Sequence, residues 1–290
     1  QYPPRDACCK CLSVALDWRE TDRAGEVLAE TTIRVSPDPY FRERLPWRIG
    51  TVQLAAGPVA VCHLHGEVGR GDAVRLALKL DRAGQGVMVA LPREGSELMQ
   101  DDPMLREMSS DPKHRRVLIT DARSPLALAL AQALLSAGAA EIFLGEPEHW
   151  RRWEGRAAFE GMESVSLMPL DVTDGASVSR LAAEIGGKVD ILINTAQFIR
   201  PGGVLGSDTI FAREGMETNV LGLMRLAQGF GPAMAARTAD GVNSAVAWVN
   251  LLSVGALAPE AGFGGFDASQ AAARSLSQTM RAEFAGSGLR

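Results

Sequence analysis

Short apolar runs that alternate with helical stretches constrain this chain's fold more than any other feature, and they begin at about residue 115. Each run is mostly apolar without a polar residue at every second position, which is typical of a strand buried on both faces of a parallel sheet. The runs are residues 116–120, 141–144, 165–170, 189–194 and 245–252, and the expected helices are 126–137, 176–185 and 215–234. This alternation predicts an α/β domain, a Rossmann-type doubly wound parallel sheet, over residues 114–290.

Residues 1–92 have a different pattern, which predicts a small β-rich domain ahead of the α/β domain. Apolar and β-branched stretches lie at short spacing between turn signals such as Ser36-Pro37-Asp38-Pro39, as in a small barrel or sandwich. The expected strands are residues 31–35, 49–54, 59–65, 73–80 and 86–91. Residues 93–113 are polar and carry two prolines, so we interpret them as a linker with a short helix around 104–108.

Length and composition agree with two globular domains, because 290 residues suffice for two units of roughly 100–200 residues. The net charge of −5 gives no electrostatic footprint for nucleic acid or an anionic membrane. No apolar run approaches the roughly 20 residues that span a bilayer, and the first residues lack a signal-peptide pattern. Four cysteines, three of them clustered, form no disulfide framework, so we expect a cytoplasmic protein.

The clustered cysteines include a Cys-x-x-Cys pair, Cys8 and Cys11, which has the spacing of a zinc knuckle. A structural zinc site needs four ligands, and no second pair precedes Cys62. His63 and His65 alternate along a strand and so share one face, which we expect to be exposed. A degenerate knuckle without metal is therefore the favoured interpretation, and a zinc site is the alternative.

The last apolar run ends at Ser253, and Phe266-Asp267-Ala268-Ser269-Gln270 follows thirteen residues later. This segment resembles the catalytic segment of short-chain dehydrogenases/reductases, in which a serine ends a strand and Tyr-x-x-x-Lys opens the next helix. By that resemblance, Phe266 stands in the place of the tyrosine and Gln270 in the place of the lysine. Carbonyl reduction in the family uses the tyrosine as general acid, and a phenyl ring has no proton to give.

The turn after the first apolar run, from Thr120 to Ala127, resembles the Thr-Gly-x-x-x-Gly-x-Gly turn of the same family. Aligned on Thr120, the three glycine places hold Asp121, Pro125 and Ala127. Glycines there let the backbone approach a pyrophosphate at a helix N-terminus. We expect NAD or NADP to bind weakly or not at all in the usual pose. A rearranged turn, in which Arg123 supplies the positive charge for the phosphates, is the alternative.

Other positions fit the family more closely, and the resemblance spans residues 116–290. Asp171-Val172 falls at the adenine-contacting place, although Thr173 or Asp174 would also serve as a helix cap there. Asn194 and Ala196 retain two positions of the Asn-Asn-Ala-Gly segment. The remaining matches are Asn219, at the place of the asparagine that kinks the central helix and holds a relay water, and Glu146, at the place that chooses between NAD and NADP, where an acid favours NAD.

The N-terminal region resembles the zinc-ribbon and OB-fold proteins that accompany thiolases and other acyl-CoA enzymes. The resemblance rests on the order of Cys8-x-x-Cys11, Pro39-Tyr40, the segment 50–57 and the turn 69–74. It implies a domain that binds acyl-CoA or docks onto a partner enzyme.

Together these features favour a catalytically impaired, dehydrogenase-like subunit in acyl-CoA metabolism, because glycine turn, tyrosine and lysine are all replaced. It would form a homo- or hetero-oligomer with a thiolase or an active dehydrogenase. Arg290 falls where the family begins its next strand and substrate-covering lobe, so we expect that lobe to be absent or to follow in a longer chain. The alternative is an active NAD(P)-dependent oxidoreductase of hydroxy- or ketoacyl substrates, using Ser253, Asn219 and an unidentified acid.

Overall fold

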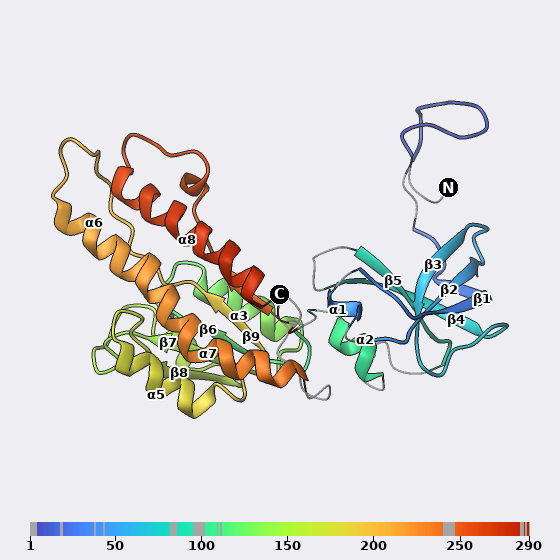
Figure 1. Cartoon of the computed structure of the whole chain (residues 1–290), viewed down its shortest axis with the longest axis horizontal. Helices are drawn as coiled ribbons and strands as arrows, with labels where there is room; N and C mark the ends of the chain where they lie inside the picture. The colour runs from blue at the N-terminus through green and yellow to red at the C-terminus, as the bar shows by residue number, and fades with distance from the viewer. Residues whose placement is uncertain are drawn as a thin grey trace. The chain divides into compact units, whose positions relative to one another are not determined.

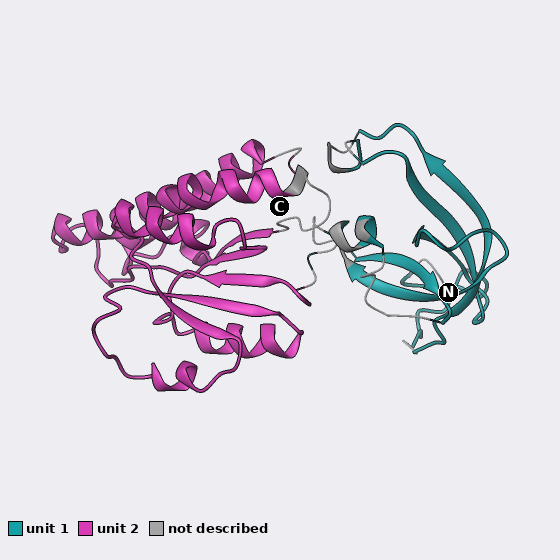
Figure 2. Cartoon of the chain, turned by 90° about the horizontal axis from the view of Figure 1, so that it is seen from below, with its two compact units in different colours: residues 1–111 teal, residues 112–290 magenta. Residues whose placement is uncertain are grey.

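The computed structural model describes residues 5–17, 20–37, 39–42, 44–81, 86–94, 102–108, 110, 112–239, 247–284, 287 and 289. The chain divides into two compact units, residues 1–111 and residues 112–290 (Figure 2). Asp38, residues 245–246 of the last predicted strand, and Arg290 at the chain end lie outside the described residues. Each unit is built around its own hydrophobic core.

Unit 1 is a closed five-stranded barrel with the strand order β1-β2-β3-β5-β4 (Figure 1). Its elements are β1 (Ala24–Ile33), α1 (Pro39–Arg42), β2 (Trp47–Leu54), β3 (Val59–Leu64), β4 (Ala73–Leu80), β5 (Gly86–Pro92) and α2 (Pro103–Met108). Strands β2 and β3 form the predicted hairpin, with Ile49 opposite His63 and Gln53 opposite Val59. The prediction of a small β-rich, OB-like domain is therefore confirmed.

Two local predictions for the barrel are wrong. The first strand begins at Ala24 rather than at residue 31, because Val27 is the single fully buried position along it and the apolar pattern does not mark its start. His65 is buried rather than exposed, and His63 is partly buried, accepting a hydrogen bond of 2.8 Å from Trp47 Nε1 on Nδ1. Burial accordingly lowers the pKa of His63, against the opposing charge of Asp81.

The short helix predicted around 104–108 is α2, and it packs onto the barrel. Leu105 and Met108 are buried in one cluster with Trp47 and Leu91. Asp102 caps the helix by accepting the N–H groups of Met104 and Leu105 on Oδ1, at 3.0 and 3.1 Å. This helix therefore lies within the first compact unit.

Unit 2 is a parallel five-stranded sheet with the order β10-β9-β6-β7-β8, which confirms the predicted Rossmann-type fold. Its strands are β6 (Arg116–Ile119), β7 (Glu141–Glu146), β8 (Val165–Pro169), β9 (Ile191–Asn194) and β10 (Ala247–Asn250). Its helices are α3 (Ala127–Ser136), α4 (Ala157–Glu160), α5 (Gly175–Ile185), α6 (Thr209–Met216), π-helix η1 (Glu217–Leu221), α7 (Gly222–Ala239), 3-10 helix η2 (Val254–Ala256) and α8 (Gly264–Glu283).

Helices cover both faces of this sheet, as Figure 2 shows for unit 2. Leu118 and Leu192 point into a core shared with α5, α7 and α8, whereas Val117 and Ile119 point into a core shared with α3 and α4. Burial on both faces explains why these strands are mostly apolar in the sequence and lack a strict alternation of apolar and polar residues. Each fully buried leucine or isoleucine contributes roughly 1.5–3 kcal/mol. Among the described helices, none is long and apolar enough to cross a membrane.

A close backbone contact holds β7 against the turn between β6 and α3. A Cβ added at Gly145, near the end of β7, would lie 2.3 Å from the carbonyl oxygen of Thr120. The backbone of β7 therefore touches the turn between β6 and α3, and Gly145 accepts the Ala122 N–H at 2.7 Å. Any side chain at residue 145 would push the two apart.

Candidate functional site

The predicted site residues gather at the carboxyl ends of the parallel strands, which is where ligands bind in open α/β sheets. Thr120 follows β6, Asn194 ends β9 and Glu146 ends β7. Ser253 follows β10 and caps the short helix η2. The structure thus brings together residues that lie far apart in the sequence.

A buried hydrogen-bond network joins the ends of β6 and β9. Thr120 Oγ1 donates to Asn194 Oδ1 at 2.8 Å and accepts the N–H groups of Thr195 and Ala196 at 3.0 and 3.2 Å. All four residues are buried. The network satisfies polar groups that would otherwise be costly to bury, so these retained positions hold the sheet edge together.

The turn between β6 and α3 carries Asp121 and Arg123. Asp121 Oδ1 accepts the Arg123 N–H at 2.8 Å, so its carboxylate folds back over its own turn. Burial raises the pKa of Asp121, while the Arg123 backbone hydrogen bond and the Arg123 charge oppose that shift. A pyrophosphate at a Rossmann turn needs backbone donors and no adjacent negative charge, so these residues do not fit the phosphates in the usual pose.

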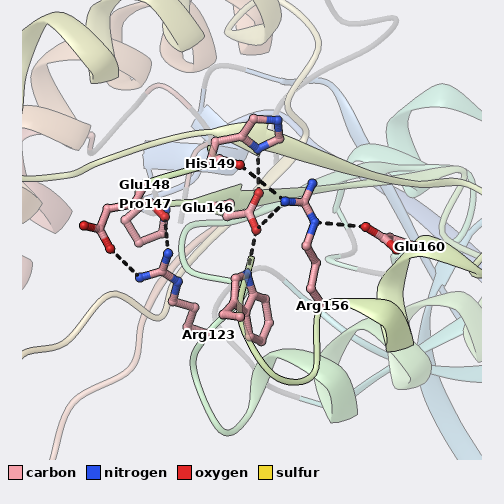
Figure 3. Close-up of polar contacts among 8 residues, drawn as sticks. Arg123, Glu146, Pro147, Glu148, His149, Arg156 and Glu160 are labelled. Atoms are coloured by element: carbon pink, nitrogen blue, oxygen red, sulfur yellow. Dashed lines mark hydrogen bonds and ion pairs between the residues drawn. The ribbon is translucent and has the colours of Figure 1, made fainter. Parts of the chain in front are cut away.

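The guanidinium of Arg123 extends away from the turn toward the end of β7 (Figure 3). It donates to the Pro147 carbonyl at 2.6 Å and lies 3.3 Å from Glu148 Oε2. Its positive charge is therefore paired within the chain. This pairing disfavours the alternative in which Arg123 supplies the positive charge for the phosphates.

Glu146 lies at the centre of the cluster in Figure 3, with its carboxylate fully enclosed. Oε1 accepts the Trp153 Nε1–H at 2.6 Å and lies 3.3 Å from Arg156 Nη1. Oε2 lies 2.5 Å from His149 Nδ1. Both oxygens are thus occupied by the segment that follows β7. That Glu146 chooses between NAD and NADP stays a prediction.

The three partners of Glu146 were not among the sequence-predicted residues. Trp153, Arg156 and His149 lie in an irregular segment, whose residues show no helical or strand period. The single usable signal was the density of aromatic and basic residues directly after a buried strand.

Asp171 and Val172 lie in the loop after β8. Asp171 Oδ1 accepts from the backbone N–H and the hydroxyl of Thr173, at 2.8 and 2.7 Å. Asp174, one of the two predicted caps, is the N-cap of α5 and accepts the Ala176 N–H at 2.9 Å. Val172 is buried against the central helix.

Asn219 lies in the π-helical segment η1, where the central helix changes its hydrogen-bond pattern. Its Oδ1 accepts the Phe198 N–H at 2.7 Å, and its Nδ2 donates to the Phe198 carbonyl at 3.1 Å and to Ser269 Oγ at 2.8 Å. The side chain is buried, so all three bonds are shielded from water. Asn219 therefore clamps the segment after β9 to helices η1 and α8.

Ser253 and Gln270 are in direct contact. The Ser253 backbone N–H donates to Gln270 Oε1 at 2.9 Å, and Ser253 Oγ accepts the Gly255 N–H at 3.1 Å. Gln270 is 1% exposed, so its amide has a structural role at the place of the family's lysine. A lysine there would bring an ammonium group into the same buried position.

Phe266 is buried at the start of α8 and borders a pocket of about 270 Å³. Phe198, Arg200 and Phe211 also line it, with the Arg200 guanidinium 3.7 Å from the Phe211 ring centre. The adjacent Asp267 is buried and accepts the Glu260 N–H at 2.7 Å. Asp267 therefore does not present a free carboxylate in the place of the missing acid.

The N-terminal cysteines lie on the surface of the described residues. Cys8 is partly exposed and Cys11 is exposed, and hydrogen bonds from the backbone of Cys11 and Lys10 lower the pKa of Cys8. Burial in the barrel raises the pKa of Cys62 to about 11. Within the described ranges, no group of three or more histidine, cysteine, aspartate or glutamate side chains could hold a metal ion.

Two protein families match the chain. The family described as short chain dehydrogenase matches residues 115–290, and the one described as ChsH2, C-terminal OB-fold domain, matches residues 18–79. Galactitol 2-dehydrogenase (L-tagatose-forming) of Cereibacter sphaeroides is 32% identical over 177 residues, which are 59% of this chain and 66% of that protein. Fatty acyl-CoA reductase of Acinetobacter baylyi is 30% identical over 178 residues, 59% of this chain and 58% of the relative.

Solved structures give the same result for unit 2. A short chain dehydrogenase from Burkholderia cenocepacia J2315 in complex with NADP superposes with a TM-score of 0.52 at 28% identity, over 62% of this chain and 70% of that one. NADH-dependent reductase A1-R', complexed with NAD, has a TM-score of 0.53 at 22% identity, over 62% and 77%. The matched segment spans 60% and 66% of the length of two of the curated relatives.

Proposed function

Because the chain belongs to the short-chain dehydrogenase family, we propose that it is a catalytically impaired member that acts as a scaffold or partner subunit in acyl-CoA metabolism. The observation that carries this proposal is the contact between Gln270 Oε1 and the Ser253 N–H at 2.9 Å. It gives the residue at the lysine place a structural role, next to a phenylalanine at the tyrosine place.

The chemistry of these side chains supports impairment. Carbonyl reduction needs a proton donor within reach, and a positioned general acid contributes typically ~10²–10⁴ in rate. Phe266 has no ionisable proton and Gln270 carries no charge. The replaced residues are therefore those on which proton transfer depends.

The link to acyl-CoA rests on two comparisons. The barrel of unit 1 is similar to the C-terminal OB-fold domain of ChsH2, and unit 2 is similar to a protein named fatty acyl-CoA reductase. The proposed role of the barrel is to bind acyl-CoA or to recruit a thiolase or an active dehydrogenase.

Partly exposed apolar side chains along the long helices support an oligomer. Ile210, Met216, Leu221 and Met224 are 37–51% exposed on α6, η1 and α7. Apolar side chains that stay exposed on helices are a feature of interaction sites. The proposed assembly is a homo- or hetero-oligomer that buries this surface.

The alternative is an active NAD(P)-dependent oxidoreductase that acts on a hydroxy- or ketoacyl substrate. The intact network of Thr120 and Asn194 and the Asn219 clamp favour it, because the sheet edge retains its form. The relative of known structure that is 28% identical was solved in complex with NADP. Its acid would have to come from outside the Tyr-x-x-x-Lys positions.

Calorimetric titration of the purified protein with NAD(H), NADP(H) and acetyl-CoA tests the proposal. We expect acetyl-CoA to bind and nicotinamide cofactors to bind weakly or not at all. A thiolase that remains bound through purification supports the recruiting role. This thiolase should be lost when the barrel surface carries Val61→Asp, since Val61 is 62% exposed. Micromolar cofactor binding accompanied by turnover of a 3-hydroxyacyl-CoA contradicts the proposal.

A further inference from the structure

We propose that Asp121 closes the dinucleotide phosphate site of unit 2, because its carboxylate accepts the Arg123 N–H and its carbonyl accepts the Ser124 N–H, two of the backbone donors of the β6–α3 turn. The residue thereby excludes NAD(H) and NADP(H) from the usual pose. This closure extends the proposed function and rests on it in one respect, because both predict that the protein shows no turnover that depends on a nicotinamide cofactor.

The hydrogen bonds of the turn account for its available backbone donors one by one. Residues 121–124 and 126–127 each donate a backbone N–H to an acceptor within the chain, and Pro125 has no N–H to offer. The acceptors, in order, are Thr195 Oγ1, the Gly145 carbonyl, Asp121 Oδ1, the Asp121 carbonyl, Ser124 Oγ and the Ser124 carbonyl. A phosphate would have to displace these acceptors to gain the donors that a Rossmann turn normally presents.

Asp121 contributes most to this closure. Its Oδ1 holds the Arg123 N–H at 2.8 Å, and its carbonyl holds the Ser124 N–H at 3.2 Å. An anionic oxygen on a turn N–H is the arrangement that a bound phosphate makes, so the carboxylate stands in for the ligand's oxygen. It also places a negative charge where two phosphate charges would lie, and like charges in an interface cost several kcal/mol.

Arg123, the one cation of the turn, does not offset that charge for a ligand. Its guanidinium contacts Pro147 and Glu148 at the end of β7, as Figure 3 shows. The approach of β7 to the turn at Gly145 leaves no room to open the turn from that side, because a single Cβ there would already meet Thr120 at 2.3 Å. The turn is therefore closed by charge, by hydrogen bonding and by packing.

The experiment measures equilibrium binding of NADH and NADPH to the full chain by isothermal titration calorimetry. Asp121→Gly and Asp121→Ala remove the carboxylate, and both are allowed because residue 121 does not have a positive φ. We expect either variant to bind at least one of the two cofactors about tenfold more tightly than the unmodified protein, or more. Circular dichroism of each variant establishes that it is folded.

Two further variants separate the causes. Asp121→Asn keeps an acceptor for the Arg123 N–H and removes the charge, so its gain should be smaller than that of Asp121→Gly. Asp208→Gly is the matched control, because Asp208 also accepts a backbone N–H, that of Ile210 at 3.0 Å, as the exposed N-cap of α6. It should bind the cofactors no better than the unmodified protein.

Each remaining outcome overturns the inference. Micromolar binding of either cofactor by the unmodified protein shows that the turn is open, and if no turnover accompanies it the proposed function still stands. Folded Asp121→Gly and Asp121→Ala variants with no gain, or a gain confined to the triple variant D121G/P125G/A127G, show that Asp121 is not what closes the turn. Equal gains in Asp121→Asn and Asp121→Gly show that charge acts without occupation of the donors.

Discussion

Two sets of residues at the same sheet edge differ in what they contact. Thr120, Asn194 and Asn219, which match the family, direct their side chains into buried hydrogen bonds with other parts of the chain. Asp121 and Phe266 replace residues that meet cofactor or substrate in the family. The retained positions are therefore those that support the fold. The changed positions are those that hydride transfer uses in the family.

Gln270 connects the two sets. It stands at a changed position, yet its amide oxygen has taken over a structural contact with the Ser253 N–H. The residue at the place of the family's lysine thus supports the end of β10 in this chain. Reversing the change should consequently exchange stability for activity.

The largest expected effect is on activity. The triple variant D121G/F266Y/Q270K restores a general acid, a cation and an open turn, so the rate of ketoacyl-CoA reduction should rise about 100-fold or more over the unmodified protein. The assay follows NADPH consumption with a 3-ketoacyl-CoA. D121G/Q270K, which keeps Phe266, is the matched control and should show no gain. If the triple variant is folded but no faster, the site differs from the family by more than these positions.

The next effect is on stability. Asn219→Ala leaves the backbone N–H and carbonyl of Phe198 without their partners, and the protein should lose about 3 kcal/mol of unfolding free energy. Urea denaturation followed by circular dichroism measures it. Gln278→Ala, at an exposed position of the neighbouring helix α8, should change stability by less than about 0.5 kcal/mol. Equal losses in the two variants would remove Asn219 from the structural set.

Thr120→Val gives a smaller loss of about 2 kcal/mol, because a methyl group of similar shape replaces the hydroxyl that bonds Asn194, Thr195 and Ala196. The same denaturation experiment applies. Thr279→Val, at an exposed site where the hydroxyl bonds the Ser275 carbonyl, is the control. A variant as stable as the unmodified protein would mean that Thr120 is retained for another reason.

The smallest expected effect concerns pH. Burial raises the pKa of Asp121 in the folded state, so its contribution to stability is present below the unfolded-state pKa and is lost as pH rises through the folded-state pKa. Asp121→Asn, which does not ionise, should therefore be more stable than the unmodified protein at neutral pH, by less than either of the two losses above. The difference should vanish in acid. Thermal unfolding of both proteins from acid to neutral pH measures this difference in stability. A difference that grows toward acid pH would contradict the raised pKa of Asp121.

Much of unit 2 could be predicted from the sequence, because strands buried on both faces leave short, mostly apolar runs such as 116–120 and 189–194. The end of the predicted helix 126–137 has a local signal as well, because Gly138 follows α3 with a φ of +84°, a conformation that favours glycine. Long-range polar pairs such as Thr120 with Asn194 leave no local pattern. They could be inferred only through the family resemblance.

The parts that could not be predicted are those in which a polar side chain is buried by irregular chain. Glu146 has the sequence context of an exposed ribose contact, yet Trp153 and Arg156 enclose it. His65 alternates along an apparent exposed face, but β3 ends at Leu64, so the alternation no longer sets its direction. In both cases the side chain is buried next to irregular chain, and such chain shows no helical or strand periodicity in the sequence.

We propose that unit 2 keeps the fold of the family and has lost its hydride chemistry. The most direct test is a steady-state assay of the unmodified full chain with NADPH or NADH and a saturating 3-ketoacyl-CoA, beside the triple variant D121G/F266Y/Q270K in the same buffer. We expect the unmodified chain to consume cofactor no faster than the protein-free background, and the variant to consume it faster than that background. Repeated turnover by the unmodified chain would contradict the claim.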